Sequence, residues 1–178
     1  FLYGVAREGV RAREFEEAIE WLVSAGMINR VYNVSKAEHP LPAFDKLDFF
    51  KLYFFDTGLL KAMAGLDNSA ILLKSNYQFK GALAENYVLQ QLKIQFDVEP
   101  RYYSVRNEEI DFLIQRGQEI IPVEVKGGTD KSAPSFKKYI AEKSPKTAIR
   151  FSEMGYIKNG DITNIPLYLA CKTLSLIV

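Results

Sequence analysis

Three charged residues stand inside segments of this 178-residue chain that otherwise read as buried strands. Asp111 lies in the apolar run IDFLI, and Glu124 and Lys126 alternate with valines in VEVK. Strand interiors disfavour Asp, and less strongly Glu and Lys, and charged groups are rarely buried unless they are paired or bound to a ligand. Two close carboxylates repel each other, and a hard divalent cation is the usual remedy. With a lysine beside them to hold a water molecule or a phosphate oxygen, such acids are typical of metal-dependent phosphodiester hydrolysis.

A tight hairpin is the element that would bring the two acids together. The segment 109–115 is apolar on both sides of Asp111, which predicts a strand buried on both faces. A second strand is predicted over 118–126, with Gly117 supplying the turn between them. As antiparallel neighbours the two strands can place Asp111 near Glu124. The alternative for VEVK alone is an amphipathic strand whose polar face, with Glu124 and Lys126, meets water.

A third acid, Glu85, is predicted on the apolar face of a long helix, FKGALAENYVLQQLKI. Its neighbours at helical spacing are Gly81, Ala82, Val88, Leu89 and Leu92. The polar residues Asn86, Gln90 and Lys93 are expected elsewhere around the helix. A carboxylate that faces a core must be neutralised, hydrogen-bonded or bound to a cation. A salt bridge or a helix cap is the alternative to a catalytic role.

The first part of the chain has the pattern of the last helix and the wing of a winged helix. A helix is predicted over 13–25, with apolar residues at helical spacing and Gly26 as its stop. Strands are predicted over 27–34 and 51–55. Trp21 is expected in the core of this layer, because its helical neighbours are apolar. Packing against a neighbouring domain would explain the same pattern without DNA contact.

The second part of the chain is predicted to form an α/β domain. We expect a winged-helix-like segment over 1–65, a linker over 66–78 and this domain over 79–178. Besides the elements already named, the pattern predicts further strands near 101–105, 147–151 and 155–158, a helix near 133–143, and a hairpin turn at Asn159-Gly160-Asp161.

Composition favours a globular, cytoplasmic protein that acts without a membrane. Hydrophobic residues make up 48% and charged residues 25% of the chain, and no apolar run approaches the roughly 18 residues of a membrane span. The single Cys171 and single His39 exclude an intrachain disulfide and a Cys-rich zinc site, which favours a reducing compartment.

The net charge of +1 does not by itself indicate a nucleic-acid binder, but the basic residues are unevenly distributed. The segment 126–150 contains seven basic residues and two acidic ones. The basic ones are Lys126, Lys131, Lys137, Lys138, Lys143, Lys146 and Arg150. They are suited to contact a phosphate backbone, and a solvated helix face is the alternative.

The order Glu85, Asp111, Glu124-Val125-Lys126 resembles the PD-(D/E)xK nuclease superfamily, in which a helix donates a Glu, one strand an Asp, and the next strand (D/E)xK. The thirteen-residue step from the Asp to the second Glu is similar to that of archaeal Holliday-junction resolvases. This chain has Ile110 where the Pro of the pattern would be.

This resemblance implies a restriction-endonuclease-like α/β fold, with a mixed sheet flanked by helices. It also implies a site for Mg²⁺ or Mn²⁺. Asp111, Glu124 and the carbonyl of Val125 would bind the ion, Glu85 would complete the site directly or through water, and Lys126 would orient the attacking water.

Four blocks in order, KLYFFDTGLL, GALAENYVLQQL, EIDFLI and PVEVKGG, resemble the DUF4143 domain. In that family the domain follows an AAA-type ATPase domain and a winged-helix segment in bacterial and archaeal proteins. This chain has no GxxxxGK[ST] phosphate loop, since KGGTDKSA is not one, and it begins FLYGVAREG. We therefore expect no ATP site here, and an ATPase domain of the same polypeptide as a partner.

Two functions remain open from the sequence. The first is a Mg²⁺-dependent DNA phosphodiesterase with Glu85, Asp111, Glu124 and Lys126 as its catalytic residues, which the presence of all four charges favours. The second is a non-catalytic regulatory module of the ATPase that binds a partner or DNA, which the near-zero net charge favours. The sequence leaves the oligomeric state open.

Overall fold

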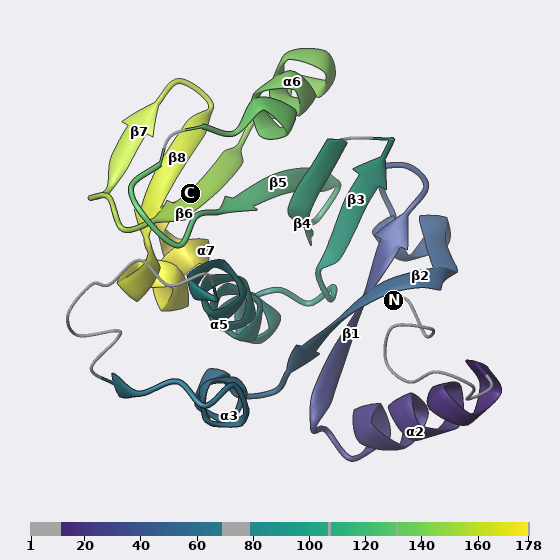
Figure 1. Ribbon diagram of the computed structural model, residues 1–178. Helices are drawn as coiled ribbons and strands as arrows, with labels where there is room; N and C mark the ends of the chain where they lie inside the picture. Colours follow the sequence, from purple (N-terminus) through teal and green to yellow (C-terminus); the bar gives the residue numbers. More distant parts are fainter. Residues whose placement is uncertain (1–11, 69–78, 107, 131, 178) are drawn as a thin grey trace.

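One mixed sheet of eight strands organises the chain, in the order β2-β1-β3-β4-β5-β6-β8-β7 (Figure 1). The structure is a computed structural model that describes residues 12–68, 79–106, 108–130 and 132–177. The strands are β1 (Ile28–Val34), β2 (Asp45–Phe54), β3 (Arg101–Val105), β4 (Glu108–Arg116), β5 (Glu119–Val125), β6 (Ala148–Ser152), β7 (Ile157–Asn159) and β8 (Ile162–Pro166). The helices described are α2 (Ala12–Ser24), α3 (Thr57–Met63), α5 (Lys80–Gln95), α6 (Pro134–Lys143) and α7 (Thr173–Leu176), with 3-10 turns η1 (Leu41–Phe44) and η2 (Leu167–Lys172). The predicted α/β class is confirmed.

The hairpin predicted to carry the acids is present. Strands β4 and β5 are antiparallel from Phe112↔Val123 to Arg116↔Glu119, and Gly117 turns between them with a φ of 58°. Glycine suits this position because left-handed backbone carries no steric cost for it. The predicted hairpin at Gly160 joins the antiparallel strands β7 and β8 in the same way. None of the described helices is long and apolar enough to cross a membrane.

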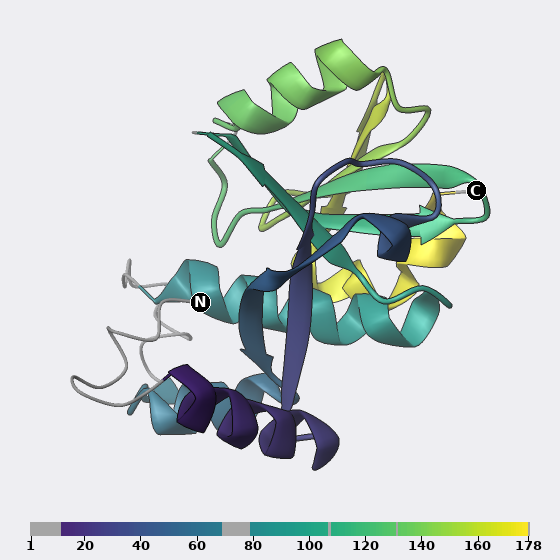
Figure 2. The ribbon, with the colours of Figure 1, turned by 90° about the vertical axis from the view of Figure 1, so that its right-hand side faces the viewer.

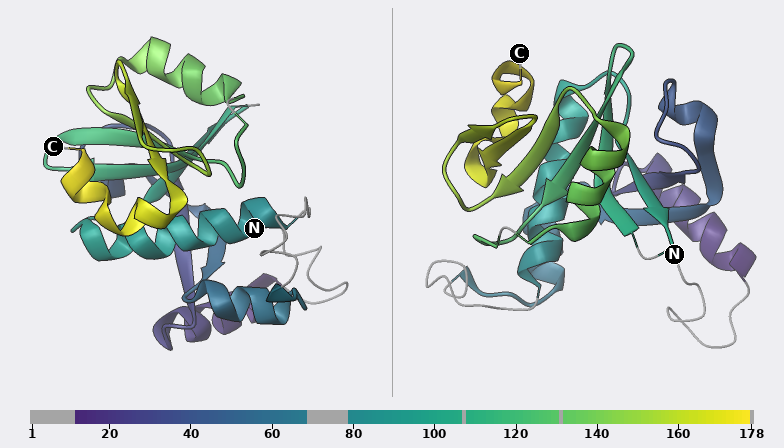
Figure 3. Two further views of the ribbon diagram at one scale, coloured as in Figure 1. Left: turned by 90° about the vertical axis from the view of Figure 1, so that its left-hand side faces the viewer. Right: turned by 90° about the horizontal axis from the view of Figure 1, so that it is seen from above.

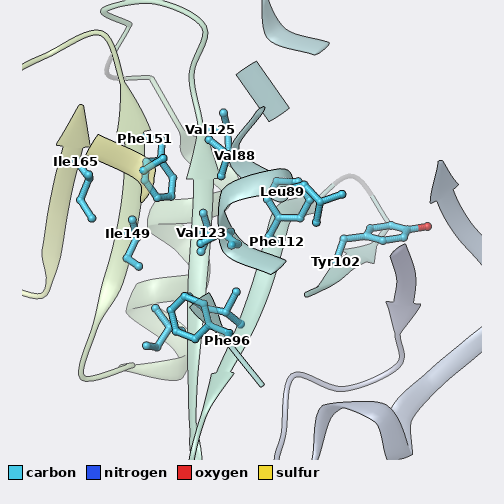
Figure 4. Packing of buried hydrophobic residues seen from close by; sticks show 14 of the residues in the cluster. Val88, Leu89, Phe96, Tyr102, Phe112, Val123, Val125, Ile149, Phe151 and Ile165 are labelled. Atoms are coloured by element: carbon cyan, nitrogen blue, oxygen red, sulfur yellow. The ribbon is translucent and has the colours of Figure 1, made fainter. Parts of the chain in front are cut away.

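Helices cover both faces of the central strands. Helix α5 packs its buried Val88, Leu89 and Leu92 against Phe112 and Val123 on one face (Figure 4). Helix α6 lies on the opposite face, where its aromatic side chains pack against Ile110 and Leu113. Ile110, Phe112, Leu113 and Ile114 are each at most 1% exposed. The prediction that this strand is buried on both faces is therefore confirmed.

Helix α2 and strand β1 agree with the predicted elements within one residue, whereas β2 begins six residues before the strand predicted over 51–55. Strand β1 pairs antiparallel with β2 and parallel with β3, where Asn33 lies opposite Tyr102. Arg101 of β3 also makes two hydrogen bonds, of 2.7 and 2.9 Å, to the carboxylate of Asp45 at the start of β2. The first part of the chain thus extends the sheet of the second. In Figure 2 and in the left panel of Figure 3, α5 lies in the middle of the molecule, with α6 above it and α2 and α3 below it.

The expectation that Trp21 is buried is wrong, because this side chain is 67% exposed. Helix α2 packs through Ile19, which is 5% exposed, and a residue two positions further along lies about 200° around a helix. The apolar neighbours Ala18 and Ala25 are exposed as well. The exposed indole is flanked along α2 by acidic residues, among them Glu20, so this surface is unfavourable for a phosphate backbone.

Candidate metal centre

Glu85, Asp111 and Glu124 come from three elements, α5, β4 and β5, and they meet closely enough to influence one another. Burial raises the pKa of Asp111 to about 7, and the negative charges of Glu124 and Glu85 add to the effect. Burial also raises the pKa of Glu124, and Glu85 contributes there as well. Mutual repulsion of this kind requires short distances in a partly desolvated site. The three acids are therefore coupled by charge, and their convergence on one metal-binding pocket stays a prediction.

A bulge in β4 explains how an Asp is accommodated inside a strand. Between the pairs Arg101↔Leu113 and Tyr103↔Ile110, β3 advances two residues while β4 advances three, so β4 carries an extra residue. The pairing of β4 with β5 begins at Phe112, the residue after Asp111. At the bulge, Oδ2 of Asp111 accepts a hydrogen bond of 2.7 Å from the amide of Val125. The carboxylate therefore stands in for a backbone carbonyl where the two strands separate.

Glu124 lies in β5 and Lys126 directly follows this strand, and Nζ of the lysine is 2.7 Å from Oε1 of the glutamate. Glu124 is 6% exposed, whereas the side chain of Lys126 is 28% exposed. The lysine opposes the rise in the pKa of Glu124 that burial causes. In turn, burial lowers the pKa of Lys126, but Glu124 outweighs this and raises it, so the lysine is a cation at neutral pH. The lysine is therefore the more exposed partner of this ion pair.

Strand β2 contributes two residues that the sequence analysis did not assign to the site. Oη of Tyr53 donates a hydrogen bond of 3.1 Å to Oε2 of Glu85. Burial raises the pKa of Tyr53, and the charge of Glu85 adds to this, so the phenol keeps its proton. Lys51 pairs with Glu109 and is also influenced by the charges of Glu85 and Asp111. The available signal was the alternation of Lys51 and Tyr53 in KLYFF, which puts both on one face of a strand.

The cluster carries an excess of negative charge. Four carboxylates, of Glu85, Glu109, Asp111 and Glu124, influence one another and face two ammonium groups, of Lys51 and Lys126. When all are ionised, these six groups carry a net charge of −2, and the raised pKa of Asp111 means that protonation relieves part of it near neutral pH. A divalent cation would compensate this charge, and carboxylate oxygens are the ligands that Mg²⁺ and Mn²⁺ prefer.

The acids are neighbours, but they do not form a complete coordination shell. In the part of the chain that the structure describes, no group of three or more His, Cys, Asp or Glu side chains is arranged to hold a metal ion. One oxygen of each acid is engaged by a protein donor: Asp111 by Val125, Glu124 by Lys126, and Glu85 by Tyr53. Binding of an ion by all three acids would therefore require their side chains to move closer together, and it could use the second oxygen of each.

The expectation that Asn86 lies away from the core is wrong. It is 1% exposed, whereas Glu85 beside it is only partly buried. Asn86 accepts a hydrogen bond of 2.8 Å from the amide of Phe54 and donates one of 3.1 Å to its carbonyl. It also donates to Oγ1 of Thr57 at 3.2 Å. The end of β2 packs against a second side of α5, so this side of the helix is buried although its residues are polar.

Fold and site together define a mixed α/β protein with a carboxylate cluster where two central strands separate. The family model described as "Domain of unknown function (DUF4143)" matches residues 80–169, and this chain belongs to that family. A second model, "Domain of unknown function (DUF8612)", matches residues 1–70. No curated protein and no solved structure matches the chain. Glu85, Asp111, Glu124 and Lys126 fall in the first match, whereas Tyr53 falls in the second.

Proposed function

We propose that this chain carries a metal-dependent phosphodiesterase site that acts on DNA. The observation that carries the proposal is the uncompensated charge of the acid cluster, with Lys126 at its rim. The order of the acids along α5, β4 and β5 supports a restriction-endonuclease-like core, and the order α2, β1, β2 supports a winged-helix-like segment before it. On this proposal, an AAA-type ATPase domain of the same polypeptide is the partner.

Each side chain has a defined role in the proposed site. Asp111 and Glu124, with the carbonyl of Val125, would hold Mg²⁺ or Mn²⁺, and Glu85 would complete the site directly or through water. When bound, such an ion lowers the pKa of water and stabilises charge on a phosphoryl oxygen. Lys126 would position the attacking water and stabilise the negative charge that develops on the phosphate.

A second candidate is a non-catalytic module that regulates the ATPase through a partner or DNA. It is favoured by the hydrogen bonds that already engage one oxygen of each acid. In this alternative the acids stabilise the junction of α5 with the separating strands, and no ion is needed.

The deciding experiment is cleavage of supercoiled, linear and single-stranded DNA with Mg²⁺ or Mn²⁺, beside Ca²⁺, which should support binding better than cleavage. Asp111→Asn should lower the rate by orders of magnitude. Glu119→Gln is the matched control, because Glu119 also lies on the β4–β5 hairpin but pairs with Arg116 at 2.8 Å, away from the cluster. No hydrolysis by the unmodified protein, together with no thermal shift in millimolar Mg²⁺ or Mn²⁺, would exclude the enzyme and leave the module.

A further inference from the structure

A second polar site lies beside the acid cluster, in a hollow between α6 and the strands β6, β8 and β7. Its volume is about 260 Å³. It is lined by Lys137, Arg150, Met154, Ile157, Asn159, Ile162 and Asn164. The lining contains two basic side chains and no carboxylate, so the hollow favours an anion.

A buried hydrogen-bond network holds Arg150 in place. Asn164 is 1% exposed, and its Oδ1 accepts hydrogen bonds of 2.9 Å from Nε of Arg150 and 2.8 Å from Oγ of Ser152. Its Nδ2 donates at 2.8 Å to the carbonyl of Gly155, which fixes the orientation of the amide. Both terminal nitrogens of the guanidinium remain without a protein partner among the described residues. The network therefore positions a guanidinium whose two terminal donors are available to a ligand.

Two other lysines near the site differ from Lys137, because they are paired with acids. Lys126 pairs with Glu124, and Lys138, next to Lys137 on α6, pairs with Glu108. Lys137 makes no ion pair with any residue that the structure describes. A guanidinium fork and a free ammonium group around one hollow are well suited to a phosphate group.

Strand register places the hollow next to the acid cluster. In the parallel pairs, Glu124 of β5 lies beside Arg150 of β6, and Arg150 lies beside Asn164 of β8. Adjacent strands are about 4.8 Å apart, so the hollow begins roughly 5–10 Å from Glu124. Successive phosphates of one DNA strand rise by about 3.4 Å along the helix axis, and because they also rotate around it they lie roughly 6–7 Å apart. That separation therefore corresponds to one or two nucleotides.

We propose that Lys137 and Arg150 bind a backbone phosphate of the DNA strand, one or two nucleotides from the phosphodiester that reaches the acid cluster. This inference rests on the proposed function, because it takes DNA as the substrate. It assigns a phosphate contact to two of the seven basic residues between positions 126 and 150. The same contact carries no base specificity, since a phosphate is common to every sequence.

The test is binding of a fluorescein-labelled oligonucleotide in EDTA and in Ca²⁺, where cleavage is suppressed. Arg150→Gln and Lys137→Met should each raise Kd about five- to ten-fold, and each should reduce the slope of log K against log salt by about one. Lys137 is exposed on α6, so its variant should retain the fold even if loss of Arg150 disturbs the buried network. Lys172→Met is the control: this exposed basic residue lies outside the hollow and outside the segment 126–150, and its variant should bind within about two-fold of the unmodified protein.

The outcomes separate this inference from the proposed function. If the unmodified protein binds DNA through these two residues but cleaves nothing, the phosphate site stands and the phosphodiesterase does not. Unchanged binding in both variants, or no DNA binding by the unmodified protein, overturns the phosphate site whatever is cleaved. Inorganic phosphate is the second arm, and a Kd for it equal to that of the oligonucleotide would assign the hollow to free phosphate instead of DNA.

Discussion

The phenol of Tyr53 and the carboxylate of Glu85 are joined by a hydrogen bond of 3.1 Å. Tyr53 is 8% exposed, and the centre of its ring lies 5.6 Å from that of Phe112 in β4. This packing holds the hydroxyl group that donates the hydrogen bond. Glu85 belongs to the part of the chain matched by the DUF4143 model, and Tyr53 to the part before it. The orientation of one proposed metal ligand is thus set by a residue outside the matched domain.

Tyr53→Phe should weaken Mn²⁺ binding about ten-fold, because removing the partner that orients a ligand typically costs 10–100-fold in metal affinity. The loss of stability should stay within about 1.5 kcal/mol, since only one hydrogen bond is removed. Isothermal titration with Mn²⁺ and urea denaturation would measure the two effects. Tyr32→Phe is the control, because its hydroxyl bonds to Arg30 at 3.1 Å and not to an acid of the cluster. Equal Mn²⁺ affinities for both variants would remove Tyr53 from the site.

The stability of the metal-free protein should fall as the pH rises from about 4 to about 7. Burial, with Glu124 and Glu85, raises the pKa of Asp111 from 3.8 to about 7. Across this interval the folded state binds more protons than the unfolded state, so the free energy of unfolding decreases with pH and then levels off. Asp111→Asn should reduce this decrease, and Glu124, whose pKa is also raised, should account for the remainder. Urea denaturation of the unmodified protein and of Asp111→Asn at several pH values would measure the free energy of unfolding of each. The difference between the two free energies should change with pH, and a constant difference would contradict the prediction.

Lys126→Ala should separate metal binding from turnover. The variant frees the oxygen of Glu124 that Lys126 engages at 2.7 Å, so Mn²⁺ affinity should be kept or slightly increased. The rate of DNA cleavage at saturating metal should fall by orders of magnitude, because the group that positions water and stabilises the phosphate is lost. Loss of metal affinity in parallel with the rate would instead make Lys126 a structural counter-ion.

Asn86→Ala should destabilise the fold by about 1–3 kcal/mol, because the amide of Phe54 loses its acceptor and the carbonyl of Phe54 keeps only a hydrogen bond of 3.5 Å from Asn29. Gln90→Ala is the comparison: Gln90 is only partly buried, and it accepts hydrogen bonds of 3.1 and 3.3 Å from the side chain and backbone of Thr57. Its cost should be smaller, since water can replace it. Denaturation midpoints that rank the two variants in the opposite order would show that Asn86 does not join α5 to β2.

Local patterns were sufficient for the elements around the site. The hairpin with Gly117 and the strand character of IDFLI follow from neighbours a few residues apart, and the convergence of Asp111 with Glu124 follows from the hairpin. The burial of Asn86 and the contact of Tyr53 with Glu85 join residues 32 positions apart in sequence. Such contacts depend on how β2 packs against α5, which no periodicity within either element reveals. The bulge at Asp111 likewise depends on the pairing with β3.

The pairing of β1 with β3 limits how this chain can be divided. Strand β1 covers the edge of β3, and without it β3 would present a row of unpaired backbone groups on which other chains can aggregate. Residues 79–178 moved to another protein by recombination would lose that cover, and with it the tyrosine that orients Glu85. The two matched regions are therefore expected to be inherited as a unit, and a fragment expressed from residue 79 onward should need a substitute strand to remain monomeric.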